Sequence, residues 1–293
     1  LTTNASSRLY FAGSGAIAGT LVGPNNALGN VEFLASRSFS NSASTTDFVI
    51  TSGTVTAPAT LLTIAGNYTN SGSFEHNSGT VYFESGSAQS LSGAMNTVAT
   101  DWNTLIFLGA GTKTLGANAS TSAITVSAGT LDVSGRLLTA AGAFTNNATL
   151  TTNASSRLYF AGSGAIAGTL VGPNNALGNV EFLASRSFSN SASTTDFVIT
   201  SGTVTAPALL TIAGNYTNNG TFSAGSGTVY ASSSSQQTFS GNMTGTANAF
   251  NNLTILNTSG TGGGAGAQSV VFAAAASTTG TFTMNASTSA QFL

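Results

Sequence analysis

The sequence predicts an all-β protein, a parallel β-helix (β-solenoid), and three observations carry this prediction. The chain repeats itself over long distances, its apolar residues fall in short alternating triplets, and clusters of Gly, Ser, Thr and Asn separate the triplets. Such a chain forms many short strands joined by tight corners, and tandem repetition stacks these strands into coils that bury a common core.

The longest repeat covers half of the chain. Residues 1–59 recur without a change at 150–208, and after Thr60, which has no counterpart, residues 61–70 recur at 209–218. The sequence therefore consists of two large repeats, 1–149 and 150–293. We expect them to form one continuous solenoid.

A shorter period lies inside each large repeat. Equivalent strand-like runs contain Val31, Leu105, Val180 and Leu253, at nearly equal spacings along the chain. The chain is thus about four units of about 74 residues, two in each large repeat.

Each unit contains about four apolar–variable–apolar triplets. In the first unit they are Leu9–Phe11, Val31–Phe33, Phe48–Ile50 and Leu62–Ile64, before Val81–Phe83 opens the next. This alternation is typical of a half-buried strand, so middle residues such as Glu32 and Thr63 are expected to face water. Four segments in about 74 residues predict roughly 18–19 residues per coil and about 16 coils.

The triplets are separated by turn clusters such as 51–53 and 127–129, where Gly tolerates the positive φ of a sharp corner. Asn67, Asn147 and Asn215 recur at such corners. Two interpretations are open for these residues: they form stacked ladders along the coils, or they are simply good turn residues.

A tandem array of four β-sandwich domains is the alternative fold. Immunoglobulin-like domains usually need about 100 residues and longer strands. The runs here are only three to five residues long, and no window has the apolar spacing of a helix. We therefore favour the solenoid.

Composition excludes several classes of function. Charged residues make up 5% of the chain, and the net charge of −2 with six scattered basic residues argues against a nucleic-acid or acidic-membrane partner. Without Cys there is no disulfide scaffold and no thiolate metal site. No apolar run approaches the roughly 18 residues of a membrane helix.

Few residues could carry catalysis. The one cluster of acids and bases is Glu75 and Glu84 flanking His76, and the second large repeat replaces it by Ser223, Ala224 and Ser232. A solvated loop face explains it better than a metal or catalytic site. The stretch 260–266 is rich in Gly but lacks the Lys of a phosphate-binding loop. We predict no catalytic, metal or cofactor-binding residues and no enzymatic activity.

Two kinds of glycan contact are open. Asn-x-Ser/Thr sequons are plentiful, as expected of a chain so rich in these residues. Tyr82 and Tyr230 are mid-strand, outward candidates for stacking on a glycan, but each is isolated. A regular Thr-x-Thr face, which an ice-binding protein would need, is not kept across coils.

Phrases at 79–89, 127–133 and 251–257, for example Gly-Thr-Val-Tyr-Phe-Glu-Ser-Gly-Ser-Ala-Gln, resemble the repeats of large secreted bacterial β-helix proteins. These include filamentous-haemagglutinin-like adhesins and autotransporter passenger domains. The resemblance covers the whole chain and implies an extracellular, adhesive or structural surface fibre without catalytic residues.

We therefore expect an extracellular structural fibre segment that assembles head to tail with itself. Leu1 corresponds to Leu150, in the middle of a coil, and the last ten residues contain no recognisable polar cap, so both ends are expected to stack on a further coil. The alternatives are a surface adhesin or phage-fibre shaft that binds glycans, and an enzyme such as a polysaccharide lyase, which would need paired carboxylates that the chain lacks.

Overall fold

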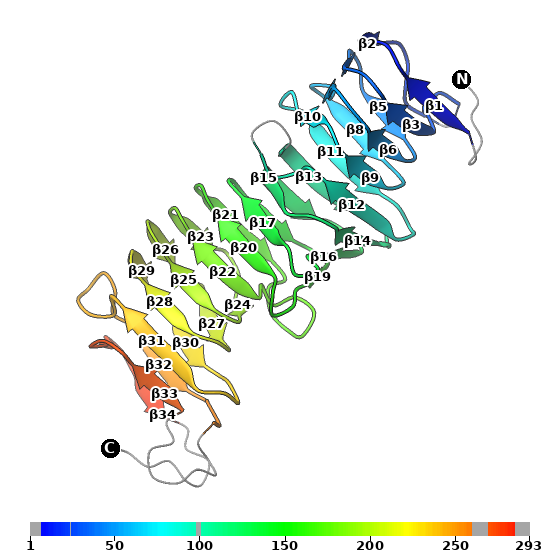
Figure 1. Cartoon of the computed structure of the whole chain (residues 1–293). Helices are drawn as coiled ribbons and strands as arrows, with labels where there is room; N and C mark the ends of the chain where they lie inside the picture. Colours follow the sequence, from blue (N-terminus) through cyan, green and yellow to red (C-terminus); the bar gives the residue numbers. More distant parts are fainter. Residues whose placement is uncertain (1–6, 24, 98–100, 260–268, 285–293) are drawn as a thin grey trace. The chain divides into compact units, whose positions relative to one another are not determined.

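The computed structural model describes residues 7–23, 25–97, 101–259 and 269–284, and in these residues every regular element is a β-strand (Figure 1). Each unit is a parallel β-solenoid, and together the coils number about 12 turns. The predicted fold class is confirmed. The chain divides into two compact units, Leu1–Ser156 and Arg157–Leu293. No helix in the described ranges is long and apolar enough to cross a membrane.

Three parallel sheets build the first unit. The first sheet contains β1 (Arg8–Phe11), β3 (Asn30–Phe33), β6 (Phe48–Ile50), β9 (Tyr68–Asn70), β12 (Gln89–Gly93), β14 (Thr112–Leu115), β16 (Thr130–Asp132) and β19 (Thr149–Thr151). The second contains β2 (Gly15–Ile17), β4 (Arg37–Phe39), β7 (Thr54–Thr56) and β10 (Ser73–Glu75). The third contains β5 (Ala43–Thr45), β8 (Leu61–Ile64), β11 (Thr80–Glu84), β13 (Trp102–Leu108), β15 (Ala119–Val126), β17 (Leu137–Ala140) and β18 (Phe144–Asn146).

The second unit repeats this plan. One row of paired strands contains β20 (Arg157–Phe160), β22 (Asn179–Phe182), β25 (Phe197–Ile199), β28 (Tyr216–Asn218), β31 (Gln237–Gly241) and β33 (Val270–Phe272). Another contains β21 (Gly164–Gly168), β23 (Arg186–Phe188), β26 (Thr203–Thr205) and β29 (Thr221–Ser223). The third contains β24 (Ala192–Thr194), β27 (Leu209–Ile212), β30 (Thr228–Ala231), β32 (Asn252–Ile255) and β34 (Phe282–Met284).

The structure has about 12 turns rather than the predicted 16, and the turns are not of one uniform length. Leu9 pairs with Val31 and Val31 with Phe48, and these two coils already differ in length. The reason is that the triplets do not all lie in one sheet. Leu62 belongs to β8 of the third sheet, so it continues the coil that Phe48 began. Counting each triplet as a coil therefore overestimated their number.

The sandwich alternative is also wrong. Every pairing given for the described strands is parallel and in register from one coil to the next, as in β1 with β3 and β3 with β6. A sandwich would pair neighbouring strands antiparallel. Short strands suffice because each is hydrogen-bonded to the coils on both sides.

The inward side chains of each strand form a common core. Val31, Phe33, Phe48 and Ile50 are fully buried, while Glu32 and Val49 between them are only half-buried. The predicted alternation is therefore confirmed for these strands. Burial of inward side chains against the coils on both sides supplies the main stabilisation.

Aromatic rings stack along the axis inside each unit. In the first unit the Phe33 ring lies 5.1 Å from that of Phe11 and 5.0 Å from that of Phe48. Further along, Trp102 packs 4.7 Å from both Tyr68 and Phe74. The second unit contains a longer series of rings: Phe160, Phe182, Phe197, Tyr216, Phe239 and Phe272. Such ring pairs add to the energy of area burial.

Glycine is required at the corners that the sequence marked as turns. Gly53 has φ of 78°, and a Cβ atom there would lie 2.6 Å from the backbone nitrogen of Ser36 on the preceding coil. A side chain at this corner would strain the backbone and push two coils apart.

We predict that replacing Phe48 by Ala lowers the free energy of unfolding by about 3–5 kcal/mol, because the change leaves a cavity within the ring stack. Val49→Ala on the same strand is the control; its side chain points outward, and its cost should stay below about 1 kcal/mol. Urea denaturation of each variant measures both. Equal losses would show that the inward column does not hold the coils together.

Candidate functional site

The structure separates the acids and the base that the sequence placed in one cluster. Glu75 ends β10 and pairs with Thr56 of β7, whose hydroxyl donates to Glu75 Oε2 at 2.8 Å. Glu84 ends β11 and pairs with Leu108 of β13, in a different sheet. The two carboxylates therefore do not converge on His76, and the described residues contain no group of three His, Cys, Asp or Glu arranged to hold a metal ion.

His76 lies in the turn between β10 and β11. Its Nδ1 accepts the backbone N–H of Ser78 at 2.9 Å, and both Asn77 and Ser78 have left-handed backbone, with φ of 48° and 57°. The charged neighbour of His76 is Asp101, which sequence reasoning missed. Burial raises the pKa of the Asp101 carboxyl, and the charge of His76 partly offsets this.

The sequence did not place Asp101 beside His76 because the coil is long at this point. Thr80 pairs with Thr104 of the next coil, so Asp101 comes to lie one long coil after His76. The shorter coil that the triplets predicted could not bring these two residues together.

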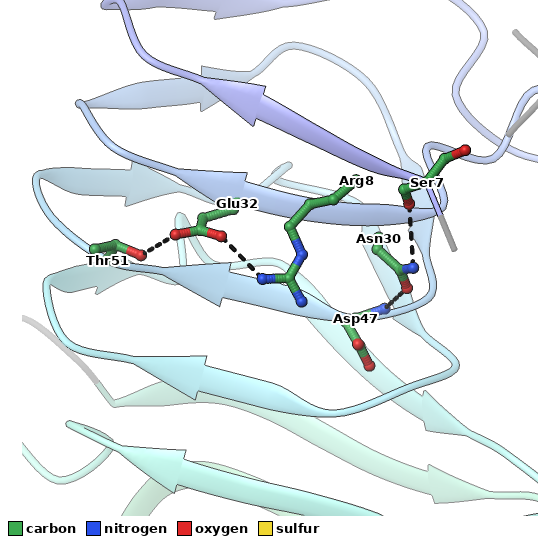
Figure 2. A network of polar contacts seen from close by, with 6 residues as sticks. All are labelled: Ser7, Arg8, Asn30, Glu32, Asp47 and Thr51. Carbon is green, nitrogen blue, oxygen red and sulfur yellow. Dashed lines mark hydrogen bonds and ion pairs between the residues drawn. The ribbon is translucent and has the colours of Figure 1, made fainter. Parts of the chain in front are cut away.

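Side chains at one corner connect successive coils of the first unit (Figure 2). Asn30 Nδ2 donates to the carbonyl of Ser7 at 3.1 Å, and Asn30 Oδ1 accepts the backbone N–H of Asp47 at 3.2 Å. Asp47 Oδ1 then accepts the N–H of Asn67 at 2.8 Å, and Asn67 Oδ1 accepts that of Ser90 at 2.8 Å. We call Asn30, Asp47 and Asn67 the corner ladder.

The second unit contains the same ladder. Asn179 Oδ1 accepts the N–H of Asp196 at 3.4 Å, and Asp196 Oδ1 accepts that of Asn215 at 2.8 Å. Asn215 Oδ1 in turn accepts the N–H of Thr238 at 2.8 Å. Each side-chain oxygen satisfies a backbone donor at a corner where the strand hydrogen bonds stop.

The two interpretations of the corner asparagines can now be separated. Asn67 and Asn215 belong to ladders, but these join a side-chain oxygen to a backbone N–H rather than one amide to another. Asn147 stands in a turn where its backbone N–H donates to the carbonyl of Val126.

A second set of side-chain contacts crosses the coils on the outer face of the first sheet (Figure 2). Glu32 accepts the Thr51 hydroxyl at 2.7 Å and the Arg8 guanidinium at 2.9 Å. These two contacts, the hydroxyl first, lower the pKa of Glu32. The pair with Arg8 is partly exposed, so its contribution to stability is small. In the second unit the Thr200 hydroxyl donates to Glu181 at 2.7 Å.

The outward side chains of the first sheet, and those of the row β20, β22, β25, β28 and β31 in the second unit, form columns of the same composition. In the first unit it is Tyr10, Glu32, Val49, Thr69 and Ser92. In the second it is Tyr159, Glu181, Val198, Thr217 and Ser240. Neighbouring coils hold these side chains about 4.8 Å apart, so each unit presents the same lateral pattern.

The two tyrosines singled out for glycan stacking lie in another sheet. Tyr82 stands between Thr63 and Ile106 of the neighbouring coils, and Tyr230 stands between Thr211 and Thr254. Their partners in register are aliphatic or hydroxylated, so neither forms an aromatic platform with them. Glycan stacking on Tyr82 or Tyr230 stays a prediction.

Several polar groups are buried inside the coils. Lys113 is fully buried, and its Nζ donates to the carbonyls of Ser85, Gly109 and Gly111 at 2.8–3.0 Å. Burial lowers the pKa of its ammonium group. Three backbone acceptors use all three donors of the ammonium group, which lets a cation remain in the interior.

Tyr68 and Tyr216 are buried with hydroxyls that have no hydrogen-bond partner. Burial raises the pKa of both phenols above 10. The side-chain amides of Asn70 and Asn218 offset a part of this rise in pKa. Neither amide is placed well enough to form a hydrogen bond with the hydroxyl.

No family model matches this chain, and neither the curated proteins nor the solved structures gave a significant match. The assignment to the β-helix class therefore depends on the strand pairing described above.

The corner ladder predicts different effects for two substitutions at Asp47. Asp47→Ala removes the oxygen that accepts the Asn67 N–H and should lower the free energy of unfolding by about 1–2 kcal/mol. Asp47→Asn keeps an oxygen at this position and should cost much less. Thermal unfolding of the two variants compares them. If Asp47→Asn is as unstable as Asp47→Ala, the ladder does not act through this oxygen.

The buried phenols predict a loss of stability in alkali. Because the folded pKa exceeds the unfolded value of 10.0, both states keep these phenolic protons below pH 10, and above it the unfolded state loses them first. The free energy of unfolding therefore falls as the pH rises above 10. Tyr68→Phe combined with Tyr216→Phe should weaken this pH dependence. The double variant should also gain about 1 kcal/mol per hydroxyl at neutral pH.

The matched control is Tyr82→Phe combined with Tyr230→Phe, which changes two outward phenols and should keep the wild-type profile. Denaturant unfolding between pH 7 and 11 measures both double variants. If the two double variants showed the same dependence of unfolding free energy on pH, the buried phenols would not be the cause of the loss of stability in alkali.

Proposed function

We propose that this chain is a segment of an extracellular structural fibre, built from stacked β-solenoid coils and assembling head to tail. The observation that carries the proposal is the outward column shared by the two units, Tyr-Glu-Val-Thr-Ser in register. A fibre needs one lateral surface repeated along its length, whereas a site for a single ligand needs one exceptional coil.

The contacts between coils support the same role. Ring stacks, corner ladders and strand hydrogen bonds all run from one coil to the next, and no bound group is needed to complete them. An array held by contacts between nearest neighbours can be extended by adding coils.

Parallel pairing between coils supplies a route for head-to-tail growth. Among the described strands, β1 pairs with β3 on one side only, and β34 pairs with β32 on one side only. A further coil, from continuing repeats of the chain or from a second copy, would extend these sheets by the same parallel pairing. Phe282 on β34 is 48% exposed, so a further coil would also cover apolar surface.

The resemblance of the repeats to secreted bacterial β-helix adhesins favours the cell surface as the location. It also carries the second candidate, a surface adhesin or phage-fibre shaft that binds glycans.

Electron microscopy of the purified chain tests the assembly. We expect filaments at high concentration, and Phe282→Lys should suppress them because an inward charge blocks the stacking of a further coil. Thr283→Lys on the same strand is the control, since Thr283 continues the outward column of Thr254 and should leave assembly intact.

Discrete monomers at every concentration, or equal effects of the two lysines, would contradict head-to-tail stacking. A second control replaces Glu75, His76 and Glu84 together. These side chains belong to neither the corner ladder nor the ring stack, and the one contact between coils among them is that of Glu75 with the exposed Thr56 hydroxyl, so filaments should persist. A loss of filaments in this variant would argue that the cluster has a role in assembly.

A further inference from the structure

One corner of the second unit contains a chemically reactive pair, Asn219 and Gly220. The pair joins β28 to β29 and is the single Asn-Gly pair in the sequence. Because glycine has no side chain, it leaves the carboxamide of the preceding asparagine open to attack by the glycine backbone nitrogen. The corner therefore brings an electrophile and a nucleophile together in adjacent residues.

The Asn219 side chain is free to react. The residue is exposed, and within the described residues no hydrogen bond holds its carboxamide. Its backbone, by contrast, is fixed, since the Asn219 N–H donates to the carbonyl of Ile199 on the preceding coil at 2.7 Å. The corner thus fixes the main chain and leaves the reactive group free to rotate.

The same corner recurs twice in the first unit. Its two corner residues are Ser71 and Gly72 in one case, and Asn147 and Ala148 in the other. In all three corners the first N–H donates to a carbonyl of the preceding coil at 2.7–2.8 Å, and an inward Asn Oδ1 accepts the second N–H at 3.0–3.3 Å. The first copy has no carboxamide, and the second has a methyl group on the attacking residue. Of the three corners, the one at Asn219 combines a free carboxamide with glycine.

Other asparagines that precede a small residue are restrained. Four precede serine, and a hydrogen bond holds the side chain of each: Asn41, Asn70, Asn77 and Asn190. Such a carboxamide must leave its partner before it can be attacked, at a net cost of about 1 kcal/mol. Asn219 carries no such cost.

We propose that Asn219 is a modification site that converts spontaneously into aspartate and isoaspartate. The Gly220 nitrogen loses its proton and attacks the side-chain carbonyl carbon of Asn219, so that a new C–N bond forms. The bond from this carbon to the amide nitrogen breaks, and ammonia leaves. Water then opens the cyclic imide. Opening at one carbonyl gives aspartate, and opening at the other gives isoaspartate, in which the main chain runs through the former side chain.

One contact of the corner slows the reaction. The Gly220 N–H donates to Asn218 Oδ1 at 3.1 Å, and Asn218 is fully buried. The nitrogen must leave this bond before it can lose its proton and attack. Conversion should therefore be slower in the folded chain than in an unstructured peptide of the same sequence.

Isoaspartate opens the corner, whereas aspartate does not. Isoaspartate adds a carbon to the main chain between two fixed points, the bond of Asn219 to Ile199 and that of the Thr221 N–H to the Gly202 carbonyl at 2.9 Å. The corner has no spare room, since a Cβ atom on Gly220 would lie 2.6 Å from the Gly202 oxygen. Isoaspartate thus loosens the second unit as the molecule ages. This role does not depend on filament formation.

Peptide mapping by mass spectrometry tests the site on the folded full chain during incubation in mildly alkaline buffer. An isoaspartate-specific methyltransferase quantifies the isoaspartate product. We expect Asn219 to convert about tenfold faster than Asn147 and Asn190, because one is followed by a methyl-bearing residue and the other is held by the Gly168 N–H.

Two variants separate the effect of the neighbour from that of the free side chain. Ala148→Gly removes the methyl group at an otherwise equivalent corner, so residue 147 should convert about as fast as Asn219. Ser191→Gly places glycine after Asn190, whose carboxamide stays bound to Gly168, so residue 190 should convert several times more slowly than Asn219.

Thermal unfolding tests the consequence. The parent should lose unfolding temperature as isoaspartate accumulates, whereas Asn219→Ser, which copies Ser71 of the first unit, should keep its value over the same incubation. Freshly prepared Asn219→Asp has the carboxylate without the longer main chain and should unfold close to the fresh parent.

The proposal fails if Asn219 converts no faster than Asn147, or if the Ser191→Gly variant converts at residue 190 as fast as at 219. Isoaspartate that accumulates without a fall in unfolding temperature would contradict the opening of the corner. Filaments are scored separately on Asn219→Ser, so a failure of this site is distinguishable from a failure of the fibre role.

Discussion

The register between coils is the constraint on which the structure depends. Each inward residue stands on an inward residue of the neighbouring coil, as Phe33 stands on Ile50 and Ile50 on Asn70. A slip of one residue would turn the whole apolar column of a strand outward. Strands of three residues cannot fix this register by themselves, so the side chains at the corners and in the core must do so.

The corner ladder and the ring stack fix the register in complementary ways. The ladder is directional, because an oxygen of Asp47 reaches only the backbone N–H of the residue directly beside it. The ring stack is less directional but contributes more energy through burial. Charge has little part in either, which explains how a chain with so few charged residues can be well ordered. The buried Lys113 follows the same logic, since backbone carbonyls rather than acids satisfy it.

Sequence reasoning recovered the features that depend on local pattern. The triplets identified the strands, and the glycines marked corners such as the one at Gly53. It failed where the answer depends on which sheet a strand joins. The triplets at Phe48 and Leu62 look alike in sequence but lie in different sheets of one coil, and this error made the coils too short and too many.

The same limitation concealed the contacts of individual side chains. With the coil length that the triplets predicted, Asp101 could not be placed beside His76, and the partner of each corner asparagine could not be named.

Hydrogen exchange at the corners tests the central claim most directly. The amide of Asn67 lies outside the strands, yet its N–H donates to Asp47 Oδ1 on the preceding coil. Residue-resolved exchange in the native state should find this amide protected to a degree similar to that of Thr69 in β9. Exchange of the Asn67 amide at the rate of an unstructured peptide, with Thr69 still protected, would contradict a register held by side chains at the corners.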